Sequence, residues 1–165
     1  MNERTAPQYQ RILFLDFDGV LHPRGAGAAE MFCHAGPLCD LIKDADCGVV
    51  ISSSWRFHLG LRSLTRLLPK AFQGRVCGRT GPRHLGAWPK YHEITEYVQR
   101  RHISRWIVLD DSAEDFPPGC EQLILCDPRI GLDGRILERL GAWLAEAPGE
   151  QALNAKNCNG PLIPS

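Results

Sequence analysis

Two aspartates lie two positions apart at the end of an apolar run, and a glycine follows them. The run is Ile12–Leu15, the acids are Asp16 and Asp18, and Gly19 comes next. In an extended segment both carboxylates point to the same side, where they repel each other unless a cation lies between them or one holds a proton. The pattern therefore suits a magnesium-dependent reaction with one carboxylate as nucleophile and the other as general acid and base. The alternative is a solvated Asp-x-Asp-Gly turn.

A second group of acids follows another apolar run, Trp106–Leu109, in the same way. Asp110 and Asp111 come directly after this run, and Asp115 follows in the next turn. Ligands of parallel α/β sheets bind beyond the carboxyl ends of the strands. If the two runs are neighbouring strands, Asp110 or Asp111 completes with Asp16 an all-oxygen site for a hard cation such as Mg²⁺.

Groups that could bind an anion lie between the two acidic clusters. The run Val49–Ile51 leads into the hydroxyls of Ser52 and Ser53, and the first turn of a following helix offers free backbone N–H groups. Lys90 opens a predicted helix directly after a proline, where the helix dipole disfavours a cation. We therefore expect Lys90 to have another duty, such as neutralising a phosphoryl group on Asp16.

The elements that must position these side chains alternate along the chain. Helices are predicted by apolar residues at helical spacing after Pro37, after Pro89 and after Gly134. Runs without alternation of apolar and polar residues are typical of parallel strands covered on both faces. The pattern predicts an α/β fold with a doubly wound, mainly parallel five-stranded sheet and helices on both faces. The five predicted strands are Ile12–Leu15, Val49–Ile51, Val76–Cys77, Trp106–Leu109 and Leu123–Cys126.

Length and composition bound the fold further. The 165 residues suit one domain, which we place at 11–147 with tails at 1–10 and 148–165. With 44% hydrophobic and 23% charged residues, the composition excludes a disordered chain, a coiled coil and a collagen-like fibre. No apolar run approaches the roughly 20 residues of a membrane span, and the first residues lack an apolar signal segment. Seven cysteines without a C-x-x-C pair favour a cytoplasmic protein with reduced thiols over a disulfide framework or a zinc site.

The charge is unevenly distributed although the net charge is zero. Residues 56–105 carry 11 Lys and Arg against 2 Asp and Glu, a balance of +9, and residues 106–150 carry 3 against 10, a balance of −7. Such an asymmetry suggests a polyanionic ligand near the basic part, the alternative being two faces that neutralise each other. His58, Arg62 and Arg66 fall at i, i+4 and i+8 of a predicted helix, a stripe that suits phosphate contacts or a solvated helix face.

Together these residues resemble the four motifs of the haloacid dehalogenase (HAD) superfamily, most of whose members are phosphatases. The resemblance covers about residues 11–130. The motifs are an apolar strand with Asp-x-Asp-Gly-Val, an apolar strand ending in Ser or Thr, a lone basic residue about twenty positions before the last motif, and Asp-Asp-x-x-x-Asp. They match, in the same order, Asp16 and Asp18, Ser52, Lys90, and Asp110, Asp111 and Asp115. Within this match Ser53 is an alternative to Ser52, and Lys70 is an alternative to Lys90.

The resemblance implies a Rossmann-like fold of the HAD type and a two-step reaction. Asp16 would attack phosphorus to form an aspartyl-phosphate, and Asp18 would protonate the leaving oxygen and then activate water. Members that cleave carbon–halogen bonds lack the second aspartate, so its presence at position 18 favours phosphoester cleavage. The residues that the resemblance assigns are Ser52, Ser53 and Lys90 for the phosphate and, for Mg²⁺, Asp16, the main-chain carbonyl of Asp18, Asp111 and, directly or through other ligands, Asp110.

Larger members of the superfamily insert a cap domain, for which this chain has no room. Only 33 residues separate Asp18 from Ser52, and only residues 79–89 separate the third strand from the Lys90 helix. An open site suits a macromolecular substrate or closure by a partner chain. The segments 52–56 and 126–132 resemble a cap-less bacterial branch that includes HAD domains found with RNA-repair enzymes. Candidate substrate-binding residues are Arg56, Arg62 and Arg66.

We therefore expect a Mg²⁺-dependent phosphatase acting on a phosphorylated substrate such as an RNA end, without a membrane partner. One alternative is an RNA- or protein-binding module that keeps this fold with little or no catalysis. Another is a small-molecule phosphatase or nucleotidase closed by a partner subunit. Trp55 is expected in the core rather than on a base-stacking surface, and the remaining histidines are interpreted as structural or surface groups.

Overall fold

A five-stranded, fully parallel sheet forms the centre of the molecule. In the computed structural model, which describes residues 9–147, the strands follow the order β3-β2-β1-β4-β5. The chain therefore starts in the middle of the sheet and builds outward in both directions. The strands are β1 (Arg11–Leu15), β2 (Cys47–Ile51), β3 (Val76–Arg79), β4 (Trp106–Asp110) and β5 (Leu123–Leu125).

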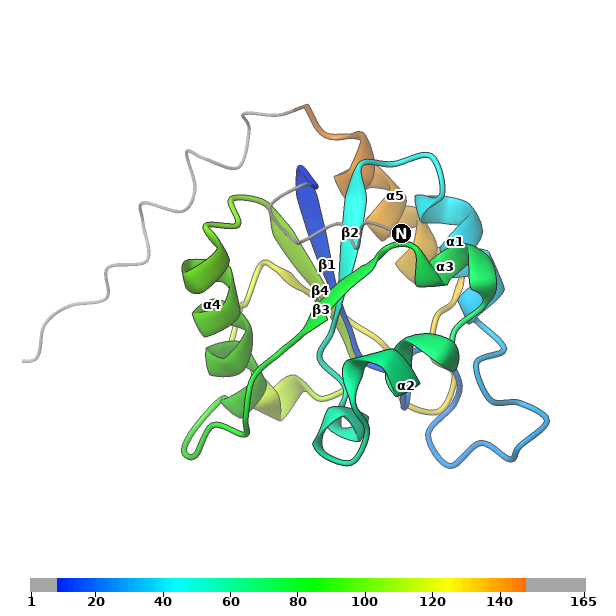
Figure 1. The fold of residues 1–165 in the computed structure, drawn as a ribbon, viewed down its shortest axis with the longest axis horizontal. Coiled ribbons are helices and arrows are strands. Elements are labelled where there is room, and N and C mark those ends of the chain that lie inside the picture. The colour runs from blue at the N-terminus through cyan, green and yellow to red at the C-terminus, as the bar shows by residue number, and fades with distance from the viewer. Residues whose placement is uncertain (1–8, 148–165) are drawn as a thin grey trace, which may run out of the picture.

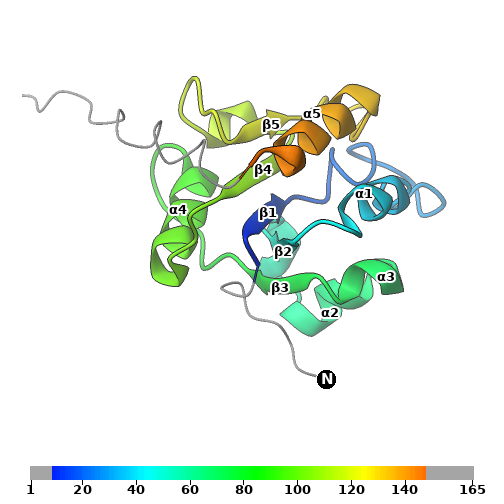
Figure 2. The same ribbon diagram turned by 90° about the horizontal axis from the view of Figure 1, so that it is seen from above.

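Helices cover both faces of the sheet, which gives three layers (Figures 1 and 2). One face carries α4, and the other carries α1 and α5 together with the short helices that follow β2. The α-helices are α1 (Ala35–Ile42), α2 (Leu61–Arg66), α3 (Lys70–Gln73), α4 (Pro89–Arg101) and α5 (Gly134–Ala145). Two 3₁₀ turns, η2 (Ser54–Phe57) and η3 (Ala113–Asp115), follow β2 and β4.

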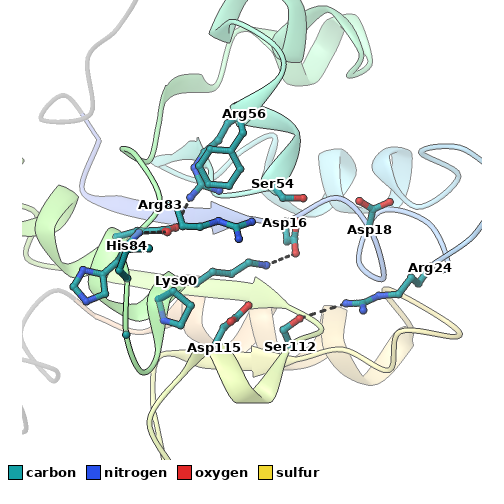
Figure 3. A pocket seen from close by; sticks show the side chains of 15 residues that line it. Asp16, Asp18, Arg24, Ser54, Arg56, Arg83, His84, Lys90, Ser112 and Asp115 are labelled. Carbon is teal, nitrogen blue, oxygen red and sulfur yellow. Dashed lines mark hydrogen bonds and ion pairs between the residues drawn. The ribbon is translucent and has the colours of Figure 1, made fainter.

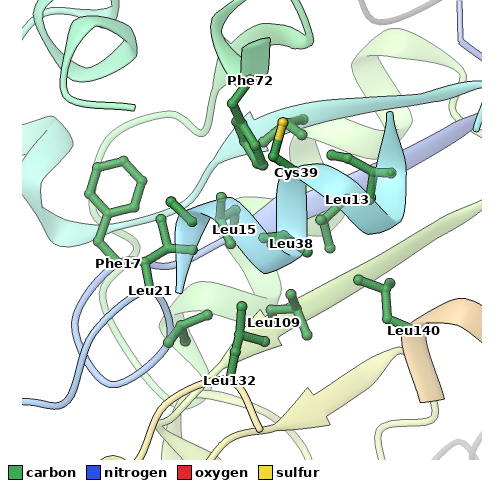
Figure 4. Packing of buried hydrophobic residues seen from close by; sticks show 14 of the residues in the cluster. Leu13, Leu15, Phe17, Leu21, Leu38, Cys39, Phe72, Leu109, Leu132 and Leu140 are labelled. Atoms are coloured by element: carbon green, nitrogen blue, oxygen red, sulfur yellow. The ribbon is translucent and has the colours of Figure 1, made fainter. Parts of the chain in front are cut away.

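The core is divided into two layers because successive side chains of a strand point to opposite faces of the sheet. From β1, Leu13 and Leu15 pack into the larger layer toward α1 and α5, which Figure 4 shows from close by. Ile12 and Phe14 pack into the smaller layer toward α4, where Ile94 is buried against them. Burying a side chain of this size contributes about 1.5–3 kcal/mol, so both layers hold the strand ends firmly in place.

The sequence predicts this architecture well. All five predicted strands and the helices at Pro37, Pro89 and Gly134 are confirmed, with ends that agree or shift by up to three residues. The predicted stripe of His58, Arg62 and Arg66 on one helix is wrong, because α2 begins only at Leu61 and His58 ends the preceding 3₁₀ turn η2.

The segments that could have held a cap domain hold none. Between β1 and β2 the chain forms α1 and connecting loops, and residues 80–88 between β3 and α4 form a loop. Within residues 9–147 no helix is long and apolar enough to cross a membrane. The six cysteines in this part of the chain are free thiols. The predicted tail 148–165 and most of the predicted tail 1–10 lie outside the described residues.

Candidate active site

Three carboxylates converge at the carboxyl edge of the sheet. Asp16 follows β1, and Asp110 and Asp111 are the last residue of β4 and the residue after it. Leu15 of β1 pairs with Leu109 of β4, so the aspartates that come next lie side by side. One oxygen from each of the three carboxylates lies within 4.8 Å of the others, and all three residues are buried. The expectation that the two acidic clusters follow neighbouring strands is confirmed.

This cluster has the chemistry to hold a hard divalent cation. Carboxylate oxygens are the ligands that Mg²⁺ prefers in proteins. The glycine after the Asp-x-Asp pair makes the close approach possible, because Gly19 has φ of +69° and an added Cβ would lie only 1.9 Å from Asp111 Oδ2. Any side chain at position 19 would therefore displace the Asp111 carboxylate from the cluster.

Lys90 lies between two of these carboxylates. Its Nζ donates to Asp16 Oδ2 at 2.5 Å and to Asp110 Oδ2 at 2.6 Å. Burial by itself lowers the pKa of Lys90, but the charges of Asp16 and Asp110 and the two hydrogen bonds raise it above its ordinary value. The ammonium group therefore stays charged in the first turn of α4, where the helix dipole alone would disfavour it. The alternative residue, Lys70, begins α3 and does not line the same cavity.

Asp110 is the most deeply buried carboxyl of the cluster, with no exposed surface. Burial raises the pKa of Asp110 to about 7, and the charge of Asp16 adds to this shift while Lys90 opposes it. Its Oδ1 accepts a hydrogen bond from the Ser112 backbone N–H at 3.0 Å. A divalent cation beside it would favour the ionised form, because an opposite charge at close range lowers the pKa of a carboxyl group.

Asp111 is held by an arginine from the loop after β1. The guanidinium of Arg24 donates from Nε to Asp111 Oδ2 at 3.0 Å and from a terminal nitrogen to Oδ1 at 2.9 Å. The same guanidinium donates to Ser112 Oγ at 3.3 Å (Figure 3). Both oxygens of Asp111 are thus occupied by one side chain that is itself 58% exposed. Nothing in the spacing of the sequence predicted this contact.

Both oxygens of Asp18 are occupied by aromatic side chains. Trp55 Nε1 donates to Asp18 Oδ2 at 2.7 Å, and His22 Nε2 lies 3.1 Å from Asp18 Oδ1. The Phe32 backbone N–H lies 3.4 Å from His22 Nδ1, which accepts from it and leaves Nε2 as the donor toward Asp18. Trp55 also packs edge-on against the rings of Phe17 and Phe32, so its indole belongs to the core, as expected, while its N–H serves the site.

The three serines after β2 have different surroundings. Ser52 is buried, and its hydroxyl has no hydrogen-bond partner among the described residues. Ser53 Oγ accepts from the Trp55 backbone N–H at 3.4 Å and so caps the turn η2. Ser54, which sequence reasoning did not select, lines the cavity above the carboxylates. A buried hydroxyl without a partner is uncommon, and at this position it favours Ser52 over Ser53 as a phosphate ligand.

A cavity of about 610 Å³ opens above the carboxylates (Figure 3). We call its floor Asp16 and Lys90, which line the cavity, together with Asp110 and Asp111, which complete the carboxylate cluster. We call Phe57, Arg83, Leu85 and Gly86 its mouth, because all four are exposed. The cavity is lined by Asp16, Asp18, Arg24, Ser54, Arg56, Phe57, Arg83, His84, Leu85, Gly86, Pro89, Lys90, Glu93, Ser112 and Asp115.

The three arginines predicted to bind substrate are separated in the structure. Arg56 lines the cavity but is buried, and its guanidinium forms an ion pair with the buried Glu93. One terminal nitrogen of Arg56 also donates to the carbonyl of Ser52 at 2.7 Å. Arg62 and Arg66 are exposed on α2 and do not line the cavity. Arg83, which the sequence analysis passed over, lines it instead.

Comparisons with known proteins agree with this geometry. The model of a family described as the HAD domain in Swiss Army Knife RNA repair proteins matches residues 12–135 of the 165. This match includes all five strands except Arg11, all the cavity residues and the first two residues of α5. No curated protein and no solved structure matches the chain. The chain belongs to the family of HAD domains in Swiss Army Knife RNA repair proteins.

Proposed function

We propose that this protein is a Mg²⁺-dependent phosphomonoester hydrolase that works through an aspartyl-phosphate on Asp16 and acts on phosphorylated nucleic-acid ends. The observation that carries the proposal is the pair of carboxylates at the end of β1, each oriented for a different task. Asp16 is buried against Lys90. Asp18 is held by Trp55 and His22, and its side chain is 38% exposed at the cavity.

Asp16 is oriented for nucleophilic attack by two hydrogen bonds. Its Oδ1 accepts from the Phe17 backbone N–H at 2.7 Å, and its Oδ2 accepts from Lys90 at 2.5 Å. In the first step an oxygen of Asp16 forms a bond to phosphorus while the bond from phosphorus to the ester oxygen breaks. The departing oxygen takes the proton of Asp18, which must be protonated when the substrate binds.

The second step reverses the role of Asp18. As a carboxylate it accepts a proton from a water molecule whose oxygen attacks phosphorus. The bond between phosphorus and Asp16 breaks, which restores the Asp16 carboxylate and releases inorganic phosphate. Positioning of these groups together with charge stabilisation supplies most of the rate enhancement in phosphoryl transfer.

The residues that would hold Mg²⁺ are Asp16, the main-chain carbonyl of Asp18, Asp111 and Asp110. When bound, the cation neutralises charge on the phosphoryl oxygens. The chain's own contribution to the same task comes from Lys90 and from the unpartnered hydroxyl of Ser52. Lys90 belongs to α4, and Phe14 and Val50 face this helix from β1 and β2. Because side chains alternate along a strand, Asp16 and Ser52, two positions further on, are expected on the same side of the sheet.

A nucleic-acid end is the substrate class that the surroundings favour. The site has no cap domain, and the wall of its cavity includes Arg24, Arg56, Arg83 and Lys90. The matching family is described by its place in RNA repair proteins. Arg62 and Arg66 remain candidates for contacts with a more distant part of a strand, since they are exposed next to the cavity segment in sequence.

The first experiment measures phosphate release from para-nitrophenyl phosphate with Mg²⁺ and with excess EDTA. The wild type should release phosphate only with Mg²⁺. Asp16→Asn should lower kcat by at least about 10³-fold, because an amide is far less nucleophilic than a carboxylate. Asp40→Asn is a matched control, since Asp40 is exposed on α1 and does not line the cavity. Retention of a tenth of the activity in Asp16→Asn would overturn the assignment of the nucleophile.

The second experiment compares substrates. Phosphate release is measured from 3′- and 5′-phosphorylated oligoribonucleotides and from the corresponding mononucleotides. The proposal expects a higher kcat/KM for one of the oligonucleotides. A preference for mononucleotides would favour the small-molecule phosphatase. Tight oligonucleotide binding without Asp16-dependent turnover of any substrate would favour the binding module.

A further inference from the structure

Arg83 differs from the other arginines and the lysine that line the cavity. Arg24 is paired with Asp111, Arg56 with Glu93, and Lys90 with Asp16 and Asp110. Arg83 forms no hydrogen bond and no ion pair within residues 9–147. Figure 3 shows its guanidinium pointing into the cavity toward Asp16. The cavity therefore has one basic side chain whose donors remain available to a ligand.

The backbone around Arg83 is fastened on both sides. Before it, the Gly81 carbonyl accepts from Arg56 Nε at 3.2 Å. After it, the His84 backbone N–H donates to Glu93 Oε1 at 2.9 Å. Arg56 and Glu93 are themselves an ion pair, each about 4% exposed. A buried ion pair thus fixes the backbone on which Arg83 stands, so this side chain is presented to the cavity with less conformational freedom than an ordinary loop arginine.

An aromatic ring supports the guanidinium. Arg83 Cζ lies 5.3 Å from the centre of the Phe57 ring, and Arg56 Cζ lies 4.2 Å from the same centre. Phe57 is still 39% exposed, and Leu85, which lines the same cavity, is 85% exposed. A cation and uncovered apolar surface therefore lie together at the mouth. Single-stranded nucleic acids are bound by this combination, with phosphates on cations and bases on apolar or aromatic side chains.

The cavity presents cationic side chains at two degrees of burial. The floor is buried, with Asp16 at 5% exposure and its partner Lys90 inside the cavity. Arg83 is exposed at the mouth. A phosphate monoester that reacts at the floor uses Asp16 and Lys90, so a guanidinium at the mouth suits a second anionic group of the same substrate. The planar fork of arginine matches the oxygens of a phosphate.

We propose that Arg83 binds the phosphodiester next to the phosphate that is hydrolysed, with Phe57 and Leu85 contacting the terminal nucleotide. This inference rests on the proposed function and makes it more specific. A mononucleotide carries only the reacting phosphate and leaves Arg83 without a ligand. An oligonucleotide with a terminal phosphate supplies both groups. Arg83 is thus the residue that distinguishes a strand end from a free nucleotide.

The test measures binding separately from turnover. In an Asp16→Asn background, the Kd of a fluorescein-labelled, terminally phosphorylated hexaribonucleotide is measured by fluorescence anisotropy between low and moderate salt. Arg83→Gln should weaken binding by about tenfold, because a charge-assisted hydrogen bond is lost. The slope of log Kd against log salt should fall by about 0.7, the value for one phosphate contact on a single strand. Arg83→Lys should lie between Arg83→Gln and the parent.

Arg100→Gln serves as the matched control. Arg100 belongs to the same basic segment, is exposed on α4 and pairs with Glu96 outside the cavity. Its removal should leave both the Kd and the salt slope within twofold of the parent values. Thermal unfolding of Arg83→Gln should lie close to the parent, since the side chain is exposed and its removal breaks no hydrogen bond or ion pair among residues 9–147.

Measurements of turnover then show which phosphate group of the substrate Arg83 binds. With Asp16 restored, Arg83→Gln should lower the ratio of kcat/KM for the oligonucleotide to kcat/KM for para-nitrophenyl phosphate by at least fivefold. An equal loss for both substrates would overturn the inference, because Arg83 would then bind the reacting phosphate. No loss for either substrate would overturn it as well. Failure of the proposed function is distinguished from failure of this inference by another observation: the wild type would then release no phosphate from the aryl ester.

Discussion

The floor and the mouth of the cavity are built in different ways. The floor comes from the ends of β1 and β4, two hydrogen-bonded strands in the middle of the sheet, and from the first turn of α4. The mouth comes from the turn after β2 and from the loop 80–88. On the floor Lys90 is paired with two carboxylates, whereas at the mouth Arg83 has no hydrogen-bond or ion-pair partner among the described residues and contacts the ring of Phe57.

This difference separates chemistry from recognition. Parallel strand ends keep Asp16 and Asp110 in register at a spacing that the backbone hydrogen bonds fix. Such rigidity suits groups that must be placed to within a fraction of an ångström for reaction. Loops vary more freely than strands and carry most of the binding residues of α/β proteins. We therefore expect changes at the floor to affect every substrate and changes at the mouth to affect one substrate class.

The largest expected effect belongs to Asp18. Asp18→Asn should slow both steps, because the amide can neither give a proton to the leaving oxygen nor take one from water. Loss of a general acid–base group costs about 10²–10⁴-fold. The loss should be smaller for para-nitrophenyl phosphate, whose leaving group needs little protonation, than for a phosphorylated oligonucleotide. Steady-state kinetics with both substrates measure the two losses.

Acid-quenched samples provide a second measurement on Asp18→Asn. Mass spectrometry of the peptide containing Asp16 should detect an added phosphoryl group, since the second step is slowed while the aryl ester still phosphorylates the enzyme. An equal loss for both substrates, with no phosphorylated peptide, would contradict the role of Asp18 in proton transfer. Asp40→Asn again serves as the control, because Asp40 is exposed on α1 and does not line the cavity.

The next effect concerns the ion pair beneath the mouth. Arg56→Met leaves the buried Glu93 carboxylate without its charged partner, and we expect the free energy of unfolding to fall by about 3–5 kcal/mol. Urea unfolding measures this change. The double variant Arg56→Met, Glu93→Leu should recover much of the loss, since no buried charge remains unpaired. If the single variant is as stable as the wild type, the Arg56–Glu93 ion pair does not stabilise the backbone around Arg83.

The floor could be predicted from the sequence and the mouth could not. Asp16 and Asp110 each follow an uninterrupted apolar run, and a parallel sheet brings the ends of neighbouring runs together, so their proximity follows from the pattern. Lys90 was found because a cation is unexpected at a helix start. Arg83 lies in a loop with no periodicity, and its position depends on a tertiary contact between Arg56 and Glu93 that no local spacing encodes.

Two contacts of Asp18 were also not predicted from the sequence. Trp55 lies 37 positions from Asp18, so its contact depends on the tertiary structure, whereas His22 lies only four positions away. Each ring also packs against Phe32, a structural role that accounts for its residue type. A buried histidine and a core tryptophan are common without any function. The shift of the start of α2 to Leu61 has a local cause, because Gly60 interrupts the apolar pattern and becomes the N-cap of the helix.

The smallest expected effect concerns Arg24, which lies in the loop after β1 and donates hydrogen bonds to Asp111 of the floor. Arg24 occupies both oxygens of Asp111, which is among the residues we assign to Mg²⁺, so the guanidinium and the cation compete for the same carboxylate. An ion pair with a partner this exposed contributes about 0–1 kcal/mol. Removing the competitor should therefore strengthen binding of a divalent cation by up to about fivefold, because the fraction of chains with a free Asp111 rises.

Titration calorimetry with Mg²⁺ or Mn²⁺ on Arg24→Met tests this competition without turnover. Arg129→Met is the matched control, since Arg129 is also an exposed arginine that binds both oxygens of an aspartate, Asp127, outside the metal cluster. Weaker cation binding in Arg24→Met would show that the guanidinium orients Asp111 for the metal instead of competing with it. In that case the loop after β1 would help to position the floor residues for the cation. Tighter cation binding would show that the loop after β1, like the mouth, is a surface element whose contacts are replaced when a ligand binds.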